Sequence, residues 1–364
     1  MVNCVYLHIP FCEKKCKYCA FCSFGLLSKK EIYLNSLTKE IKELYKGEIL
    51  KTIYFGGGTP SLLDVKDIKN ILNLFNFNSK TEITLELNPH LITKEKLLSL
   101  KEVGINRLSI GVQSFDNEIL SEIGRTHSAK EIYKTIENIK EIGFENFSID
   151  LMYGLPNQTL EIWEETLKKA LEINPAHISL YGLKIEDGTY YSKHLPKNLP
   201  DDDMQAKMYE LAIEILSKNY IHYEFSNFAK EEKYFSNHNL CYWNCKNYYG
   251  FGLSASGYIE NKRYTNTFNF SEYIKNPTKK DYETLTTEEQ IEEEIFLGLR
   301  KTKGIDFEKI NEKFDIDIYE KYKKEFDKFL ANGLMQKTQN GIKLTQKGIL
   351  ISNEILCDFI QLND

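Results

Sequence analysis

Residues 12–19 read Cys12-Glu13-Lys14-Lys15-Cys16-Lys17-Tyr18-Cys19, a run that places three thiols within one short segment. The segment before it, 5–11, is apolar and contains Pro10, which predicts a buried strand followed by a loop that carries the cysteines. Thiolates are the ligands that zinc and iron–sulfur clusters prefer. A four-iron cluster held by three thiolates leaves one iron open for chemistry, as an open coordination position does on a catalytic metal. The alternative is three unrelated buried cysteines, which the close spacing disfavours.

The composition is that of an ordinary soluble protein. The chain has 364 residues, 42% hydrophobic and 27% charged, which is enough for two domains and a large core. The net charge of -6 gives no electrostatic footprint for a nucleic acid. We find no signal-peptide pattern and no apolar run long enough to span a bilayer. Eight cysteines in such a chain favour the reducing cytoplasm, and a cluster or metal site over a disulfide framework.

The first half of the chain alternates between strand-like and helix-like segments. This alternation predicts an α/β fold of parallel strands with right-handed helical crossovers, either a partial (β/α)6 barrel or an open doubly wound sheet. Reactive groups then lie at the carboxyl ends of the strands, where the cysteine loop falls. The predicted strands are 5–9, 52–55, 83–87, 107–112, 147–153 and 177–183, and the predicted helices are 29–46, 65–75, 94–103, 129–142 and 160–173.

Other strand ends also carry glycine or polar residues. The second strand runs into Gly56-Gly57-Gly58-Thr59-Pro60, which is either a flexible turn or a place where backbone approaches a ligand. Glu86, Gln113, Arg125 and Asp150 lie at or just after the next three strands. They could satisfy one another inside a barrel, or form a cavity for a ligand with hydroxyls, an ammonium and a carboxylate.

The remaining chain predicts a segment on the barrel and a separate C-terminal domain. A helix at 202–218 and a strand at 220–226 precede a small-residue stretch, 250–257, which is a tight turn or a close backbone approach. Helices at 288–300, 307–314 and 318–332, a hairpin at Asn340-Gly341 and a helix at 345–359 resemble a winged-helix module. The acidic stretch 288–294 opposes contact with phosphates, so we expect a cap or docking surface. The predicted domains are 1–230, 231–280 and 281–364.

Together these motifs resemble the radical S-adenosylmethionine (SAM) superfamily. The cysteine run with Tyr18 and the glycine run carry the superfamily resemblance. The longer strings 6–12, 109–115 and 150–156 resemble its coproporphyrinogen-III-oxidase-like branch, which contains an oxygen-independent oxidase and the heme chaperones of the HemW family. The resemblance covers nearly the whole chain.

The resemblance implies two cofactors and their binding residues. Cys12, Cys16 and Cys19 would hold a [4Fe-4S] cluster, whose open iron is chelated by the amino and carboxylate groups of SAM. One electron from the reduced cluster then breaks the sulfonium C–S bond, chemistry that the cofactors supply and the protein orients. No catalytic side chain is implied. The SAM site would be lined by Tyr6, Tyr18, Gly57, Gly58, Thr59, Glu86, Gln113, Arg125 and Asp150.

Two departures distinguish members of the branch. The oxidase has a further cysteine two residues after the third, where this chain has Phe21, as HemW-like sequences do. Cys22 lies one position later. We interpret it as an unligated thiol, because a fourth thiolate would close the open iron and block SAM chemistry.

The second departure is the motif that runs from His238 to Trp243, which resembles a HemW signature associated with heme binding. His238 could ligate heme iron, and Tyr242 and Trp243 could pack on the porphyrin. The alternative is a hydrogen-bonded histidine beside aromatic core residues. His238, Cys241 and Cys245 could instead form a metal site, and Cys241 could be a heme ligand.

The first hypothesis is a cytoplasmic heme chaperone that binds a [4Fe-4S] cluster, SAM and heme and passes heme to an unidentified acceptor protein. A reductant such as flavodoxin or ferredoxin and a weak peripheral membrane contact during delivery would accompany it, without nucleic acid. The second is an enzyme, an oxygen-independent coproporphyrinogen III oxidase that decarboxylates propionates. The third is a cluster or metal scaffold that does not bind SAM.

Overall fold

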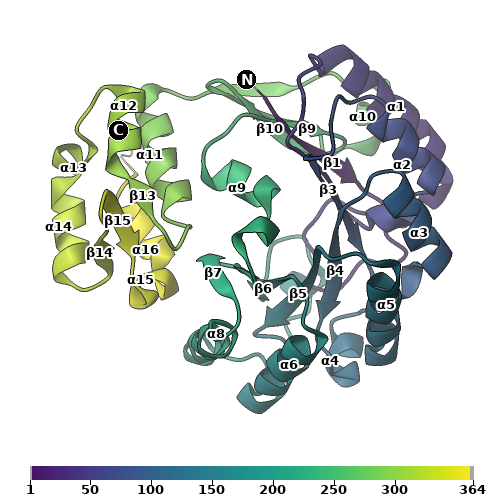
Figure 1. Ribbon diagram of the computed structural model, residues 1–364, viewed down its shortest axis with the longest axis horizontal. Helices are drawn as coiled ribbons and strands as arrows, with labels where there is room; N and C mark the ends of the chain where they lie inside the picture. Colours follow the sequence, from purple (N-terminus) through teal and green to yellow (C-terminus); the bar gives the residue numbers. More distant parts are fainter. Residues whose placement is uncertain (1, 361–364) are drawn as a thin grey trace.

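A computed structural model describes residues 2–360 and shows the predicted six parallel strands side by side. They follow chain order across one curved sheet (Figure 1). This confirms the α/β class and the partial (β/α)6 barrel. The strands are β1 (Cys4–Ile9), β2 (Thr52–Gly57), β3 (Glu82–Leu87), β4 (Arg107–Gln113), β5 (Phe147–Tyr153) and β6 (His177–Gly182).

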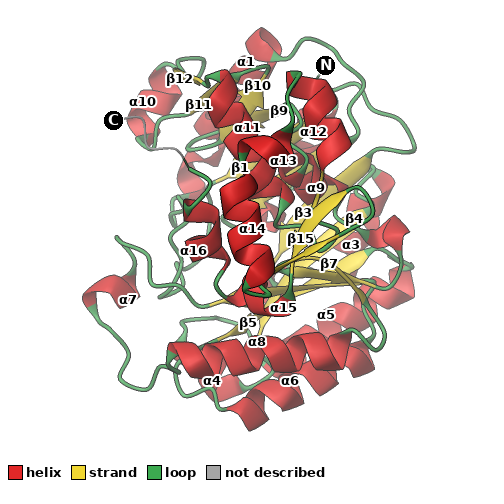
Figure 2. Ribbon diagram, turned by 90° about the vertical axis from the view of Figure 1, so that its left-hand side faces the viewer, coloured by secondary structure: helices red, strands yellow, loops and turns green. Residues whose placement is uncertain are grey.

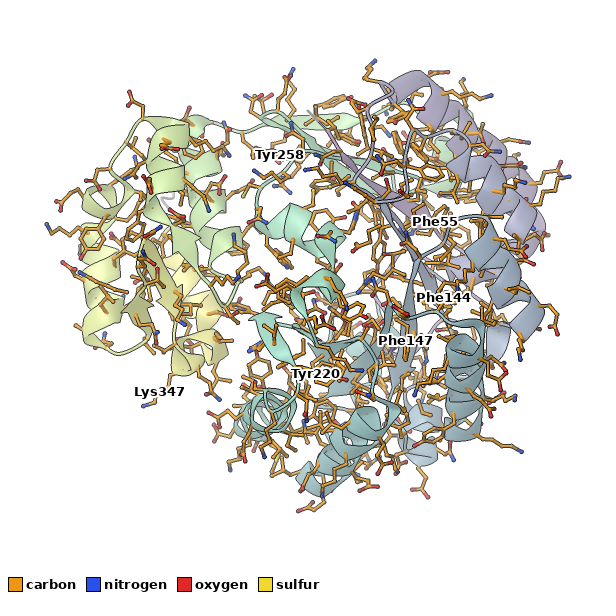
Figure 3. All side chains as sticks on the ribbon, viewed as in Figure 1. Phe55, Phe144, Phe147, Tyr220, Tyr258 and Lys347 are labelled. Carbon is orange, nitrogen blue, oxygen red and sulfur yellow. The ribbon has the colours of Figure 1, made fainter. Side chains whose placement is uncertain are left out.

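The crossover helices cover the outer, convex face of this sheet (Figure 1). Their apolar residues meet the outward-facing strand residues, and side chains such as Phe55 and Phe147 are buried in this layer (Figure 3). Local signals set the helix limits: α5 begins with a capping box between Ser128 and Glu131 and ends at Gly143, whose φ is +78°. The helices are α1 (Lys30–Leu44), α2 (Val65–Leu72), α3 (Lys94–Glu102), α4 (Asn117–Glu122), α5 (Ala129–Ile142), α6 (Leu160–Ile173), α7 (Tyr190–Lys193) and α8 (Asp202–Leu216).

Further strands extend both edges of the sheet. The edge beside β6 continues with β8 (Asn227–Ala229) and β7 (Ile221–Glu224). Beside β1 lies β9 (Tyr248–Phe251), parallel to it, followed by the antiparallel β10 (Ser256–Ile259), β11 (Lys262–Thr265) and β12 (Asp281–Thr284). The small-residue stretch thus spans the β9–β10 hairpin, where a Cβ on Gly250 would lie 1.8 Å from the Ser256 carbonyl oxygen. The predicted domain limits at 230 and 280 stay a prediction.

One buried carboxylate, that of Glu40 on α1, ties this extension to the barrel. Glu40 accepts hydrogen bonds from Gly252 N (2.9 Å), Asn266 Nδ2 (2.8 Å) and Tyr273 Oη (2.6 Å), and it pairs with Lys280 Nζ. Tyr273 belongs to α10 (Phe270–Lys275). The side chains of Glu40 and Lys280 are 0% and 1% exposed, so each charge depends on the other.

The C-terminal part is a helical domain with a small antiparallel sheet of order β13-β15-β14. This agrees with the winged-helix-like α+β prediction, including the hairpin at Asn340-Gly341. The predicted single helices 318–332 and 345–359 are wrong, because each breaks once, at Tyr322 and at Ile351. Tyr322 is buried against Phe359, and this long-range packing is invisible to helical periodicity. The elements are α11 (Thr287–Gly298), β13 (Ile305–Asp306), α12 (Phe307–Phe314), α13 (Ile318–Lys321), α14 (Lys323–Ala331), β14 (Met335–Lys337), β15 (Gly341–Leu344), α15 (Gln346–Leu350) and α16 (Ser352–Cys357).

A short helix, α9 (Asn237–Trp243), lies between the barrel and this domain (Figure 1). It packs against β2 on one side and α11 on the other. The C-terminal helices α13 and α14 lie in front of the sheet when the molecule is turned by 90° (Figure 2). Within residues 2–360, no helix combines the length and the apolar character that crossing a bilayer requires.

Candidate functional site: the cysteine loop and the barrel interior

The strand register puts polar side chains at successive inward positions of the barrel. The outward positions between them are apolar and face the helices. Burying so many polar groups is costly unless they are paired, so they form networks. The side chains of Thr84 and Arg107 each keep a buried polar atom without a partner among the described residues. One aligned layer is Tyr6, Tyr54, Thr84 and Arg107, and the next contains Glu86, Ser109, Ser148 and His177.

The cysteine loop leaves the carboxyl end of β1, as predicted. Cys12 Sγ lies 3.5 Å from Thr59 Oγ1, and Arg125 Nη1 donates to Cys16 Sγ at 3.5 Å. The Cys19 amide donates to the Cys16 carbonyl at 3.2 Å, which folds the loop back on itself. All three thiols are free and partly buried. The Arg125 guanidinium thus places a positive charge beside the Cys16 sulfur, whereas burial raises the pKa of the Cys19 thiol.

The glycine run lies directly beside this loop. Gly58 N donates to Ile9 O at 2.8 Å and Thr59 N donates to Phe11 O at 2.7 Å. Gly57 has φ +109°, and a Cβ there would lie 2.6 Å from the His8 ring. A side chain is therefore excluded at Gly57 by both backbone conformation and space, which supports the interpretation as a close approach rather than a flexible turn.

Glu86 lies half-buried near the end of β3. Its carboxylate accepts from Tyr54 Oη at 2.8 Å and from Gly57 N at 3.1 Å, so it joins the third strand to the glycine run. Burial raises the pKa of Glu86 to about 7, and the nearby Asp150 acts in the same direction. Asp150 itself accepts two hydrogen bonds from Ser109 Oγ, at 3.1 and 3.0 Å, and burial raises its pKa as well.

Asn88 is a site residue that we did not single out from the sequence. Its Nδ2 donates to Thr59 Oγ1 at 3.1 Å, and its Oδ1 accepts from Arg125 Nη2 at 2.6 Å. Asn88 thereby links Thr59, which lies beside Cys12, to Arg125, which lies beside Cys16. The only signal was its place in the string that follows β3, next to Pro89. Gln113 is buried on the neighbouring strand in the left-handed region, with φ +68°, where β4 has a bulge.

The two tyrosines of the predicted SAM site differ in position: Tyr18 lies at the cysteine loop, and Tyr6 lies inside the barrel. Tyr18 lies beside Cys16 and Arg125. Tyr6 points into the barrel, where its hydroxyl lies 3.2 Å from His8 Nδ1. His8 Nε2 donates to the Cys22 carbonyl at 2.8 Å, so its Nδ1 accepts from Tyr6. Burial lowers the pKa of His8 to about 4, which keeps this ring neutral. His8 is a second residue of this region that sequence reasoning missed.

The side chains of Phe21 and Cys22, which follow the third cysteine, do not lie beside the other three thiols. Phe21 is 67% exposed, so its ring is turned away from the protein. The Cys22 thiol lies against Ser254 and packs on the core rather than beside the other three thiols. The geometry therefore agrees with three cysteines at the loop and an unligated Cys22.

The donor set of the loop fits a four-iron cluster. In residues 2–360 no three or more His, Cys, Asp or Glu side chains converge on a point suited to a single metal ion. A [4Fe-4S] cluster does not need such convergence, because each thiolate binds a different iron. The absence does argue against a single-ion site made of His238, Cys241 and Cys245, since Cys241 is hydrogen-bonded to Cys4 instead.

The predicted heme motif lies at the opposite end of the barrel from the cysteines. The backbone amides of Asn237 and His238, at the start of α9, both donate to the Glu82 carboxylate at 3.1 Å. Glu82 begins β3, and Thr52, which contacts His238, begins β2. The length of β2 separates this end from Gly57 by about 16 Å. The cluster loop and α9 thus occupy different ends of one barrel.

His238 is a packed core residue in this conformation. Its side chain is 1% exposed, and its Nδ1 lies 2.8 Å from Thr52 Oγ1 while its Nε2 lies 2.7 Å from Tyr242 Oη. Its ring stacks on Tyr54 at 4.9 Å. Burial lowers the pKa of His238 to about 3, and the charge of Arg107 adds to the effect. Neither ring nitrogen is free for an iron here.

The rest of the motif is also engaged. The Trp243 ring packs against the Arg300 guanidinium, with 4.6 Å between the guanidinium carbon and the ring centroid. Burial raises the pKa of the free Cys245 thiol to about 12. Heme binding by His238, Tyr242 and Trp243 stays a prediction, and it would require α9 to leave this position.

Comparison with known proteins assigns the family. The Radical SAM superfamily model matches residues 6–170, and the HemN C-terminal domain model matches residues 285–351. The chain is 40% identical to the heme chaperone HemW of Bacillus subtilis (strain 168), over 98% of each chain. This chain belongs to the HemW family of radical SAM proteins. HemW of Escherichia coli (strain K12) is 37% identical over 70% of each chain.

The HemW-family fold is shared with a solved enzyme structure. Coproporphyrinogen III oxidase (HemN) from Escherichia coli, described as a radical SAM enzyme, superposes with a TM-score of 0.86 at 26% identity. The likeness covers 98% of this chain and 90% of the oxidase chain. Membership in the radical SAM superfamily implies a [4Fe-4S] cluster and SAM. The three thiols, the Arg125 guanidinium that donates to Cys16 and the backbone of Gly57 and Gly58, which carries no side chains beside the loop, fit both groups.

Proposed function

We propose that this protein is a heme chaperone, which holds a [4Fe-4S] cluster and SAM at the carboxyl end of the barrel, binds heme, and transfers heme to an acceptor protein. The observation that carries the proposal is the 40% identity to a heme chaperone HemW over 98% of each chain, together with a loop of three thiols from which Cys22 is turned toward Ser254. The acceptor and the reductant, a flavodoxin or ferredoxin, are further protein partners of this proposal. The free thiols fit a cytoplasmic protein, with a weak membrane contact only during delivery.

In this proposal the side chains of the loop and strand ends have separate tasks. Cys12, Cys16 and Cys19 hold the cluster, and Arg125 supports the Cys16 thiolate by donating to its sulfur. Asn88 fixes the Arg125 guanidinium. When bound, the cluster and SAM supply one-electron reductive chemistry.

The SAM pocket follows from the same strand ends. Gly57 and Gly58 leave room for close backbone approach, with Thr59 beside Cys12. Glu86 and Asp150 supply carboxylates for hydroxyl or ammonium groups. The remaining predicted SAM contacts are Tyr6, Tyr18, Gln113 and Arg125.

A second candidate function is the oxygen-independent oxidation of coproporphyrinogen III. The close superposition on the Escherichia coli oxidase favours it, since the barrel and the C-terminal domain align together. The two candidates differ in what the chain does with a tetrapyrrole: the chaperone binds and releases heme unchanged, whereas the oxidase removes carboxyl groups from propionates.

One anaerobic experiment separates the two. The cluster is reconstituted on the full chain, hemin is titrated by calorimetry, and the loaded protein is mixed with an apo-acceptor hemoprotein. In parallel, coproporphyrinogen III, SAM and a reductant are added, and decarboxylated product is assayed. Tight hemin binding with transfer and without product supports the chaperone. Product formation without specific hemin binding would instead identify an oxidase.

A further inference from the structure

A large groove lies between α9 and the part of the C-terminal domain that follows α11. It has a volume of about 1620 Å³, beyond the roughly 300–1,000 Å³ typical of small-ligand pockets. One wall comes from Asn237, Leu240 and Asn244, a spacing that places them on the same side of α9 and its C-cap. His238 and Cys241 face the barrel from the other side. The opposite wall comes from α12, β15 and the turn after α11.

The groove combines an apolar surface with surrounding charged side chains. Phe235 and Leu240, both partly exposed, give it apolar surface, and behind the groove Ile305 and Ile310 are buried in the core of the C-terminal domain. Six lysines and four carboxylates surround that surface, which leaves a surplus of two positive charges in a chain whose net charge is -6. The six lysines are Lys246, Lys301, Lys303, Lys309, Lys313 and Lys343.

The surplus is carried by lysines without a carboxylate partner. Lys303, Lys309 and Lys313 pair with Glu232, Asp306 and Glu294 respectively. Within residues 2–360, by contrast, Lys246, Lys301 and Lys343 make no ion pair at all.

Of these three lysines, Lys301 has the surroundings that best indicate an anion site. Its ammonium donates only to the neutral Asn244 Oδ1, at 2.6 Å. Burial lowers the pKa of Lys301, although the Glu294 carboxylate opposes the shift, and the charges of Lys309 and Lys246 lower it further. A half-buried cation among other cations is a favourable place for an anion to bind.

We propose that this groove is the heme site, in which Lys301 and Lys343 pair with the two propionates and the macrocycle lies on the apolar surface of Phe235 and Leu240. The proposal rests on the heme-chaperone function proposed above and gives that function a location. A heme is a large, flat, apolar ring with two carboxylates at one edge, which matches the two excess charges and the apolar surface. The motif helix then contributes the face that carries Leu240, and His238 holds the helix in place from behind.

A nucleic acid would also be attracted to lysines on a winged-helix-like domain. The four carboxylates in the same groove oppose it, because an extended phosphate backbone would run past Glu232, Glu294, Asp306 and Glu312. A compact dianion can avoid them.

The test compares two ligands on four proteins. Each protein is used at full length with its cluster reconstituted, and is titrated by calorimetry with hemin and with hemin dimethyl ester, in which both carboxylates are masked. The four proteins are wild type and the variants Lys301→Met, Lys343→Met and Lys347→Met. Lys347 is an exposed lysine of the same domain, away from the groove lining (Figure 3), and serves as the matched control. Circular dichroism checks that each variant is folded, and Lys343→Met keeps the test open if Lys301→Met is unstable.

We expect wild type to prefer hemin over its ester by about tenfold or more, the size of a charged hydrogen bond. Lys301→Met and Lys343→Met should each remove most of this preference without changing affinity for the ester, and Lys347→Met should leave it intact. Equal hemin binding by all four proteins would overturn the location while leaving the chaperone function standing. No hemin binding by wild type would overturn the function itself. Displacement of hemin by duplex DNA would reassign the groove to a polyanion.

Discussion

Replacing His238 separates a structural role of the heme-motif histidine from a role as iron ligand. In His238→Ala the ring is lost from a site that is 1% exposed, and Tyr242 Oη loses the hydrogen bond that joins it to Nε2. Thr52 Oγ1 loses its bond to Nδ1, although the Cys4 thiol remains beside it. One buried unsatisfied group costs about 1–3 kcal/mol, and the cavity left by a buried ring costs about 3 kcal/mol more. We expect a total loss of about 4–6 kcal/mol.

A second substitution separates the free-energy cost of losing the hydrogen bonds from the cost of losing the ring. His238→Phe keeps a ring to stack on Tyr54 and loses only the hydrogen bonds, so we expect it to cost about 2 kcal/mol. Asn239→Ala is the matched control on the same helix, because its side chain makes no hydrogen bond among the described residues, and it should cost less than about 0.5 kcal/mol. The assay is urea unfolding of the apoprotein followed by circular dichroism, with hemin affinity measured on the folded variants.

We predict that folded His238→Phe binds hemin almost as tightly as wild type. The contrary result is specific: His238→Phe that unfolds at the wild-type urea concentration but no longer binds hemin would show that the imidazole is an iron ligand, and that α9 opens to present it.

Three further predictions concern other parts of the molecule. Lys280→Met leaves the buried carboxylate that it neutralises without a cation and should destabilise the protein by about 3–5 kcal/mol in urea unfolding; a change below about 1 kcal/mol would mean that water reaches the site. Gly57→Ala forces a Cβ against the His8 ring at φ +109° and should weaken SAM binding at least about tenfold by calorimetry on the reconstituted protein, and unchanged affinity would contradict the close backbone approach. The free energy of unfolding should fall as the pH is lowered from 6.5 to about 4. Below its ordinary pKa the His238 ring takes up a proton in the unfolded chain, whereas the folded ring, whose pKa is lowered to about 3, does not. The fall should be shallower in His238→Phe, and identical pH profiles of the two proteins would contradict a neutral buried imidazole.

The sequence predicted the six barrel strands and located the cysteine loop at the end of the first. These features are local: period-two alternation marks a strand, and three thiols on one loop need no distant partner. The same holds for helix ends such as the Ser128 capping box. The extension of the sheet by β9 to β12 was missed because each of its strands has only four residues. Their placement also depends on contacts such as Glu40 with Lys280, 240 residues apart.

The role of Asn88 and the orientation of α9 could not be predicted from the sequence. Asn88 joins Thr59 to Arg125 only because parallel strands bring three loops to one edge. The motif from His238 to Trp243 gave the residue types that could meet a heme, but not the side of the helix on which each falls.

The sequence by itself determined that this chain presents three thiols on one loop and a glycine-rich strand end, because those groups are neighbours along the chain or follow strands of fixed polarity. Only the tertiary structure decided that His238 turns into the barrel, where Thr52 and Tyr242 take both ring nitrogens, while Leu240 turns toward a lysine-lined groove. The physical reason is that a helix places residues on all sides with equal ease. Which side is buried depends on the partners that pack against it, here Glu82 and Thr52 at the strand starts and Lys301 beyond the helix.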